Sequence, residues 1–233
     1  MECWKSYRTV LFDLDGTLSD SQEGIIACLR YSLAQMGIEE ADTEKLRRCI
    51  GPSLTETYKT LYGMSDEEAA RALEFYRDCF ERQGVERTAL FDGADALLEA
   101  LWRQGRTLAL ATAKPTLHAR RILEQNGILQ YFSLVAGSNL DGTREEKREV
   151  IAYALAELPK AARESAVMVG DRRHDIEGAR ENALPAIGVA YGYGGYEELA
   201  AAGAAQIVRS VEELRAALLE EAFVSSEALR RRF

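Results

Sequence analysis

Residues 9–18 of the chain read TVLFDLDGTL, and this stretch decides the fold. The apolar run at 10–12 fits a fully buried strand of a parallel sheet. Asp13 and Asp15 follow it directly. Ligands gather at the carboxyl ends of such strands, and two carboxylates placed there repel each other unless they share a cation or a proton. Mg²⁺, which prefers oxygen ligands, is the natural partner. An ordinary Asp-Gly turn is the other interpretation of these residues taken alone.

The composition limits the classes of protein. With 233 residues the chain can form one core, or one core and a smaller domain. A net charge of −9 argues against a nucleic-acid polymer or a membrane surface as partner. The N-terminus has no apolar signal region, and no stretch approaches about 18 apolar residues, so we expect a cytoplasmic protein. The oligomeric state has no sequence signal.

The four cysteines have neither CxxC spacing nor a paired histidine. This pattern suits small buried side chains in a reducing compartment better than disulfides or zinc ligands. The cysteines are Cys3, Cys28, Cys49 and Cys79.

The first part of the chain predicts helices and no further strand. Apolar residues recur at helical spacing, and Ser65 with Glu68 has the spacing of a capping box. The expected helices cover 21–36, 43–50, 53–62 and 65–82. Four helices without a strand predict a compact all-α insertion.

After Gly93 helices and strands alternate, which predicts βαβ units and a parallel sheet wound on both faces. The expected helices are 94–104, 117–126, 147–157, 175–182, 196–202 and 211–221. The expected strands are 107–112, 132–136, 165–170, 185–190 and 205–208. We therefore expect an α/β core domain of residues 1–18 and 90–233, with a helical cap domain of residues 19–89 inserted. The last residues, 230–233, are expected to be a frayed tail.

Polar side chains stand where the expected strands end. Thr112 closes one strand, with Lys114 two residues beyond it, and Asp171 closes another, followed by Asp175. Lys147 begins a helix between them. Because parallel strand ends share one edge, these groups should converge with Asp13 and Asp15. Carboxylates that hold Mg²⁺, beside a hydroxyl and ammonium groups that hold phosphate oxygens, indicate phosphoryl chemistry.

The ordered set formed by DLDGTL at 13–18, Thr112, Lys147 and GDRRHD at 170–175 resembles the four motifs of the haloacid dehalogenase-like hydrolase superfamily. The likeness runs from residue 8 to about residue 220. The helical insertion resembles the cap of the group that includes phosphoglycolate phosphatase and β-phosphoglucomutase. The resemblance implies a Rossmann-like core.

The resemblance also implies roles for the carboxylates. Asp13 would be the nucleophile, and Asp15 the general acid and base. Asp13, the backbone carbonyl of Asp15 and Asp171 would hold Mg²⁺, with Asp175 as an additional acid that orients a metal-bound water.

Thr112 would bind the transferring phosphoryl group, and Lys147 would neutralise that group and the nucleophile. Many relatives place this lysine directly before a proline, a pattern absent at Lys147. The segment 140–147 is similar instead to relatives called 5′-nucleotidase or phosphoglycolate phosphatase. Lys114, which precedes Pro115, is the rival lysine and lies near the substrate in similar proteins; a surface salt bridge is its other interpretation.

The cap offers weaker candidates. The Gly51-Pro52 turn ends a helix and is either a plain helix break or a loop that faces the substrate. In the second case Arg47 or Arg48 would contact an anion. The motif at 192–195 mimics part of a dinucleotide fingerprint but is incomplete and comes late, which favours a plain loop. His118 and His174 are expected on the surface, and Arg172 and Arg173 on a solvated rim that attracts anions.

Together these features predict a Mg²⁺-dependent phosphomonoester hydrolase that acts on a small phosphorylated metabolite through an aspartyl-phosphate. A phosphosugar mutase of the β-phosphoglucomutase type shares the same core residues and stays open as an alternative. A catalytically silent binding module is the alternative from another class. Phosphoglycolate, nucleoside monophosphates and sugar phosphates all remain candidate substrates, because cap side chains set that choice.

Overall fold

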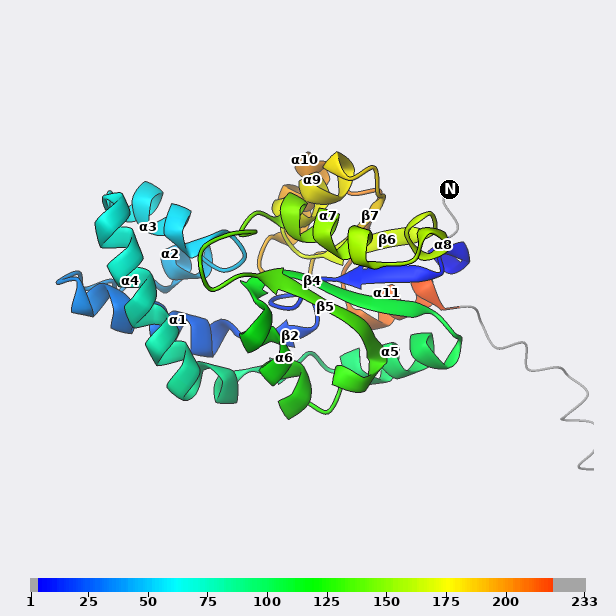
Figure 1. Cartoon of the computed structure of the whole chain (residues 1–233), viewed down its shortest axis with the longest axis horizontal. Coiled ribbons are helices and arrows are strands. Elements are labelled where there is room, and N and C mark those ends of the chain that lie inside the picture. The colour runs from blue at the N-terminus through cyan, green and yellow to red at the C-terminus, as the bar shows by residue number, and fades with distance from the viewer. Residues whose placement is uncertain (1–3, 220–233) are drawn as a thin grey trace, which may run out of the picture.

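The protein is built on a six-stranded parallel sheet, described here from a computed structural model for residues 4–219 (Figure 1). The strand order is β5-β4-β1-β6-β7-β8, which places β1 in the middle. The strands are β1 (Thr9–Phe12), β4 (Thr107–Pro115), β5 (Phe132–Ser138), β6 (Ala166–Gly170), β7 (Ala186–Val189) and β8 (Gln206–Val208). The predicted doubly wound α/β fold is confirmed.

Helices cover both faces of this sheet (Figure 1). One layer contains α5 (Ala94–Arg103), α6 (Thr116–Gln125) and α11 (Val211–Leu218). The opposite layer contains α7 (Lys147–Glu157), α9 (Arg173–Glu181) and α10 (Gly195–Ala202), with the short α8 (Lys160–Arg163) beside them. A 3₁₀ turn at Trp4–Ser6 precedes β1, and another at Leu129–Tyr131 precedes β5.

Strand β1 is buried on both faces because its side chains alternate between the two layers. Val10 and Phe12 pack into the core beneath α5, α6 and α11. Leu11 faces the other way, into the core beneath α7 and α9. Burial on both faces explains why the sequence here is continuously apolar rather than alternating.

The chain between β1 and α5 forms a helical unit at one end of the sheet (Figure 1). It contains α1 (Gln22–Gln35), α2 (Thr43–Arg47), α3 (Leu54–Tyr62) and α4 (Asp66–Cys79), followed by a π turn at Phe80–Gly84 and a 3₁₀ turn at Val85–Arg87. The capping box of Ser65 and Glu68 is present. A cap domain of residues 19–89 remains our proposal for the domain boundary.

Two very short strands join this helical unit to the sheet, and the sequence did not predict them. Strand β2 (Ser19–Asp20) pairs antiparallel with β3 (Ala89–Leu90). Each has two residues, too few for a periodic pattern. Strand β4 also runs past the predicted end at Thr112, because Pro115 still pairs with Ser138 of β5.

Three surface expectations are wrong. His118 is only 4% exposed, because α6 turns it inward against the ring of Phe80. His174 is half-buried in the first turn of α9. Arg172 is 8% exposed and binds Glu198 and the carbonyl oxygen of Ile50, so it is not a solvated rim residue. Arg173 is exposed, as expected.

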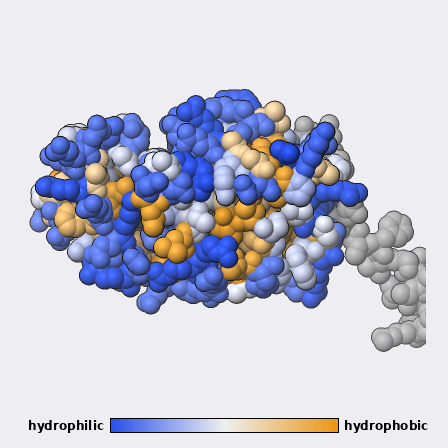
Figure 2. Space-filling view, viewed as in Figure 1, coloured by the Kyte–Doolittle hydropathy of each residue, from blue (hydrophilic) through white to orange (hydrophobic). Residues whose placement is uncertain are grey.

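The expected free cysteines are confirmed where they are described. Cys28, Cys49 and Cys79 are buried and unpaired, whereas Cys3 and the tail at 230–233 lie outside the described residues. Within residues 4–219 no helix is long and apolar enough to cross a bilayer. Figure 2 shows a mostly hydrophilic face with hydrophobic residues exposed along its middle.

The packing of α1 predicts a large difference between two substitutions on one helix. Leu33 is fully buried in the core, so Leu33→Ala should lower the free energy of unfolding in urea by about 2–5 kcal/mol. Gln35 on the same helix is exposed, and Gln35→Ala should change it by less than about 0.5 kcal/mol. Equal effects of the two substitutions would contradict the burial of this face.

Candidate active site

Three buried carboxylates meet at the carboxyl edge of the sheet. Asp13 follows β1, Asp171 follows β6, and Asp175 lies in the first turn of α9. One oxygen of each lies within 4.8 Å of the others. The adjacent central positions of β1 and β6 bring these residues together, as the sequence predicts for strand ends that share an edge.

Lys147 is the cation of this acid cluster. Its Nζ lies 2.6 Å from Oδ1 of Asp13 and 2.8 Å from Oδ1 of Asp175, and it donates to the carbonyl oxygen of Ala111 at 3.0 Å. Burial alone would lower the pKa of Lys147, but the carboxylates of Asp13 and Asp175 outweigh it and hold the pKa above its ordinary value. Lys147 is therefore charged, and it occupies the position nearest the predicted nucleophile.

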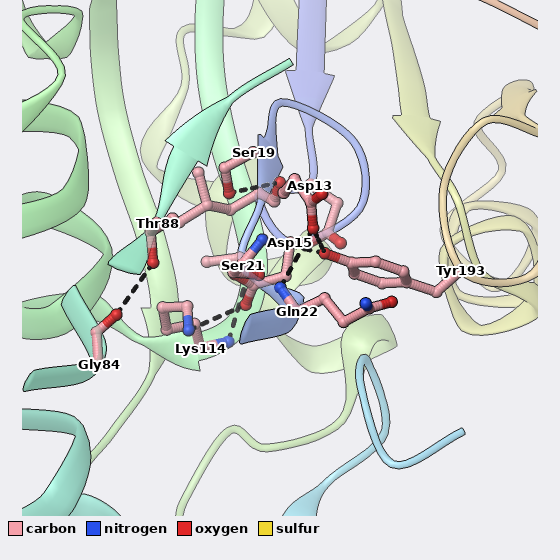
Figure 3. A network of polar contacts seen from close by, with 12 residues as sticks. Asp13, Asp15, Ser19, Ser21, Gln22, Gly84, Thr88, Lys114 and Tyr193 are labelled. Atoms are coloured by element: carbon pink, nitrogen blue, oxygen red, sulfur yellow. Dashed lines mark hydrogen bonds and ion pairs between the residues drawn. The ribbon is translucent and has the colours of Figure 1, made fainter. Parts of the chain in front are cut away.

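Lys114 lies beside the other carboxylate of the opening motif. Its Nζ is 3.0 Å from Oδ2 of Asp15 (Figure 3). The same Nζ lies 4.1 Å from the centre of the ring of Phe80, which comes from the helical cap. Both partners of this ion pair are buried, so a surface salt bridge is wrong as an interpretation of Lys114. Lys147 thus pairs with Asp13, and Lys114 pairs with Asp15.

The loop after β1 is held in place by main-chain bonds. The carbonyl oxygen of Leu14 accepts from the backbone N–H groups of Thr17, Leu18 and Ser19. Gly16 has φ of +86°, and a Cβ there would lie 2.2 Å from Oδ2 of Asp171. Glycine is therefore required both for the left-handed backbone and for the close approach to Asp171.

The excess of negative charge suits a cation. Burial, followed by the charges of Asp175 and Asp13, raises the pKa of Asp171 well above its ordinary value. Burial also raises the pKa of Asp175, to about 6, although Lys147 opposes the shift. Oδ1 of Asp15 is buried without a hydrogen-bond partner among residues 4–219. Hard oxygen ligands in this number fit Mg²⁺, and its charge would relieve the repulsion.

A pocket opens between this acid cluster and the cap. From the core it is lined by Asp13, Asp15, Thr112 and Lys114. From the cap, Gly51 and Pro52 line it, so this turn faces the site. Apolar cap side chains complete the wall; they are Ile25, Ile50, Leu54, Leu73, Tyr76 and Phe80.

The arginines proposed as anion contacts do not line this pocket. Arg48 is exposed, and Arg47 binds Glu44 and the side chain of Gln22 instead. Gly51 has φ of +106°, and a Cβ there would lie 2.9 Å from Cγ of Arg172. Arg172, rather than Arg48, is therefore the arginine that contacts this loop.

Several residues that line the pocket were not predicted from the sequence. Ser138 ends β5, and the strand-end rule that found Thr112 could have found it as well. Tyr76 and Phe80, four residues apart, mark a face of the helix that covers the site. Arg77 also lines the pocket and donates to the carbonyl oxygen of Leu140 at 2.7 Å; nothing local in the sequence distinguishes it from other surface arginines.

Comparison with known proteins identifies the family of the chain. A family model described as haloacid dehalogenase-like hydrolase matches residues 10–189, which include every member of the acid cluster. The chain belongs to the haloacid dehalogenase-like hydrolases. The predicted family is therefore confirmed.

Individual relatives of this hydrolase carry more than one name. The chain is 43% identical over 195 residues to a 5′-nucleotidase of Pseudomonas aeruginosa, covering 84% of this chain and 88% of the relative. It is 38% identical to the tyrosine-protein kinase PtkA of Mycobacterium tuberculosis, covering 92% and 73%. A crystal structure of a predicted phosphatase from Clostridium acetobutylicum has a TM-score of 0.87 and 44% identity, covering 90% and 97%.

The charge balance of the acid cluster predicts opposite effects of one substitution with and without Mg²⁺. In EDTA, Asp171→Asn should raise the unfolding temperature at pH 7.5, because the amide has no proton to bind on folding and avoids the cost of a buried carboxyl whose ionisation Asp13 and Asp175 oppose. Added Mg²⁺ should stabilise the wild type by about 2.7 kcal/mol at about 100 times its Kd, and the variant far less.

The pH dependence of stability without metal gives a second test of the charge balance in the acid cluster. Native Asp175 keeps its proton up to a pKa of about 6, against an ordinary value of 3.8, so metal-free stability should fall as pH rises across this interval. Asp92→Asn, at an exposed position, is the control and should follow the wild type throughout. Equal Mg²⁺ stabilisation of wild type and Asp171→Asn would contradict a metal site at Asp171.

Proposed function

We propose that the protein is a Mg²⁺-dependent phosphomonoester hydrolase that works through an aspartyl-phosphate on Asp13. The observation that carries the proposal is the contact of Lys147 with both Asp13 and Asp175, next to Asp171. Asp13 and Asp15 line the same pocket. Such a constellation combines a nucleophile, a fixed cation and a set of metal ligands. The phosphatase and nucleotidase names of the relatives support the same class.

In the first proposed step, an oxygen of Asp13 attacks phosphorus and the bond between phosphorus and the ester oxygen breaks. Asp15, in its protonated form, gives that oxygen its proton, so an alcohol leaves. Oδ1 of Asp15, buried and without a partner among the described residues, is the atom available for this transfer.

In the second step, Asp15 takes a proton from water as the water oxygen attacks phosphorus. The bond between phosphorus and Asp13 breaks, which releases inorganic phosphate and restores both carboxyl groups to their starting states. Asp15 thus acts first as acid and then as base, and no further proton carrier is needed.

The surrounding groups stabilise the negative charge of the nucleophile and of the transferring phosphoryl group. Lys147 neutralises Asp13 and the transferring phosphoryl group, and Thr112 donates its hydroxyl to a phosphoryl oxygen. Asp13, the carbonyl oxygen of Asp15 and Asp171 would hold Mg²⁺, with Asp175 beside them; when bound, Mg²⁺ supplies charge stabilisation of the phosphoryl oxygens.

The cap restricts the substrate to a small phosphorylated metabolite. Gly51 lines the pocket and would contact the substrate through its backbone, and Lys114 lines it next to Phe80. The apolar cap wall excludes water from the reacting atoms. A long polymer would have to displace α4, which lies across the pocket.

The nucleophile can be tested by a single substitution. Asp13→Asn should lower kcat for p-nitrophenyl phosphate with Mg²⁺ by about 10⁴-fold or more, because an amide cannot form the acyl phosphate. Phosphate release is the measurement, and Asp92→Asn is the matched control. Retention of activity by Asp13→Asn would contradict the assignment. Exchange between two sugar phosphates with little release of phosphate would instead support the mutase.

The two lysines can be separated in the same assay. Lys147→Gln should lower kcat by about 10²–10³-fold, because it removes the charge next to the nucleophile. Lys114→Gln should lower kcat/KM by about 10-fold, since it loses one ion pair at the general acid. Circular dichroism of both variants with Mg²⁺ checks folding. A larger loss of kcat for Lys114→Gln would reverse the two roles.

A further inference from the structure

The segment 192–195, which the sequence presents as a plain loop, lies directly on Asp171. A Cβ on Gly192 would stand 2.3 Å from Cβ of Asp171, and one on Gly194 would stand 2.3 Å from its carbonyl oxygen. Real side chains do not fit at such distances. The two glycines therefore allow the backbone to touch the aspartate, and Tyr193 between them supplies the side chain.

Tyr193 holds Asp171 through its backbone. Its N–H donates to Oδ2 of Asp171 at 2.7 Å. Its ring lies against Gly16, where a Cβ would come within 2.8 Å of Cδ2. The ring is thus fixed between the metal-binding edge and the loop of the nucleophile.

The other end of Tyr193 reaches the connection to the cap (Figure 3). Its hydroxyl donates to Oδ1 of Asp20 at 2.9 Å and accepts from the backbone N–H of Ser21 at 3.0 Å. Burial raises the pKa of Tyr193, so the hydroxyl stays protonated and can donate.

These contacts fall where the cap joins the core. Asp20 belongs to β2, which pairs with β3 and so brings the entry and the exit of the cap together. Ser21 is the N-cap residue of α1, and its side chain makes no capping bond. The Tyr193 hydroxyl therefore holds the N-cap residue of the first cap helix and the residue before it.

We propose that Tyr193 is a positioning residue that ties the cap connection to Asp171, so that the cap is held over the site while the carboxylate is held for its ligand. This inference rests on the proposed phosphatase function. In this arrangement Phe80 lies over Lys114, and Lys114 binds Asp15. Loss of the hydroxyl frees the cap connection but leaves the N–H on Asp171 in place.

Tyr193→Phe separates the two contacts of this residue, because it removes the hydroxyl and keeps the backbone N–H. With p-nitrophenyl phosphate, kcat/KM should fall about 10-fold, the equivalent of one hydrogen bond to a charged group. The Mg²⁺ concentration for half-maximal activity should stay within about twofold, because the backbone bond to Asp171 remains. A parallel loss of Mg²⁺ affinity would contradict the proposal and indicate general loosening of the loop.

Tyr191→Phe is the matched control. The Tyr191 hydroxyl comes from the same segment and donates to the carbonyl oxygen of Thr17 at 2.8 Å, and not to Asp20 or Ser21. Its ring packs edge-on against Phe91, a contact that Tyr191→Phe keeps. Removal of this hydroxyl should lower kcat/KM by less than about threefold. Equal losses for Tyr191→Phe and Tyr193→Phe would overturn a specific role of Tyr193.

A double-mutant cycle tests the partner. Asp20→Ala removes the acceptor of the Tyr193 hydroxyl. It should therefore lower kcat/KM clearly less in the Tyr193→Phe variant than in the wild type. Asp20 also accepts from the N–H of Gln22, but that loss is common to both backgrounds and cancels. Simple additivity of the two substitutions would contradict the coupling.

Amide hydrogen exchange gives a readout independent of activity. In Tyr193→Phe the Ser21 N–H loses its acceptor, so residues 19–24 should exchange about 10-fold faster while α5 is unchanged. Unchanged exchange of residues 19–24 would contradict the proposal that the Tyr193 hydroxyl holds the cap connection. A wild type that released no phosphate would contradict the proposed function alone, because this exchange measurement would still decide the role of Tyr193.

Discussion

Three buried carboxylates at one edge of a sheet repel one another, and the ammonium group of Lys147 holds two of them side by side. Its contacts with Asp13 at 2.6 Å and Asp175 at 2.8 Å join the end of β1 to the start of α9. Lys147 itself begins α7, so the ion pairs also fix that helix against the sheet. Burial and the charges of Asp175 and Asp13 raise the pKa of Asp171, so a cation beside this carboxyl would offset the cost of ionising it.

The cap meets this charged edge through contacts of a different kind. Phe80 offers its ring to Lys114, Ser53 donates to Glu145 at 2.6 Å, and Arg77 donates to the carbonyl oxygen of Leu140. Arg172 of the core donates in return to the carbonyl oxygen of Ile50. These polar contacts lie beside apolar packing that continues from the cap helices into the core layer beneath α5 and α6, so both kinds of contact hold the cap over the site.

The core and its charged edge were predictable because local patterns carried the information. An apolar run that ends in Asp13 identifies a buried central strand, and the topology of a parallel sheet then brings Asp171 to it without further assumption. The topology also predicted that Lys147 converges on this edge, but its role beside the nucleophile came from resemblance to a known family. No local pattern marks a lysine as the partner of two carboxylates 134 and 28 residues away.

The remainder depended on tertiary packing. Strands β2 and β3 exist because two distant dipeptides meet, which no local period encodes. His118 and Arg172 carry polar side chains that composition assigns to the surface, yet His118 packs against the Phe80 ring and Arg172 pairs with Glu198. The segment at 192–195 has the sequence of a flexible loop, and only its proximity to Asp171 explains Gly192 and Gly194.

The central claim is that a covalent bond forms between phosphorus and Asp13. The most direct test is to mix the Mg²⁺-loaded protein with p-nitrophenyl phosphate, quench with acid, reduce with borohydride and map the product by mass spectrometry. An acyl phosphate is reduced to an alcohol whereas a free carboxylate is not, so homoserine should replace aspartate at position 13 and at no other position. Substrate turnover with position 13 unmodified, or with the modification at another carboxylate, would contradict the account.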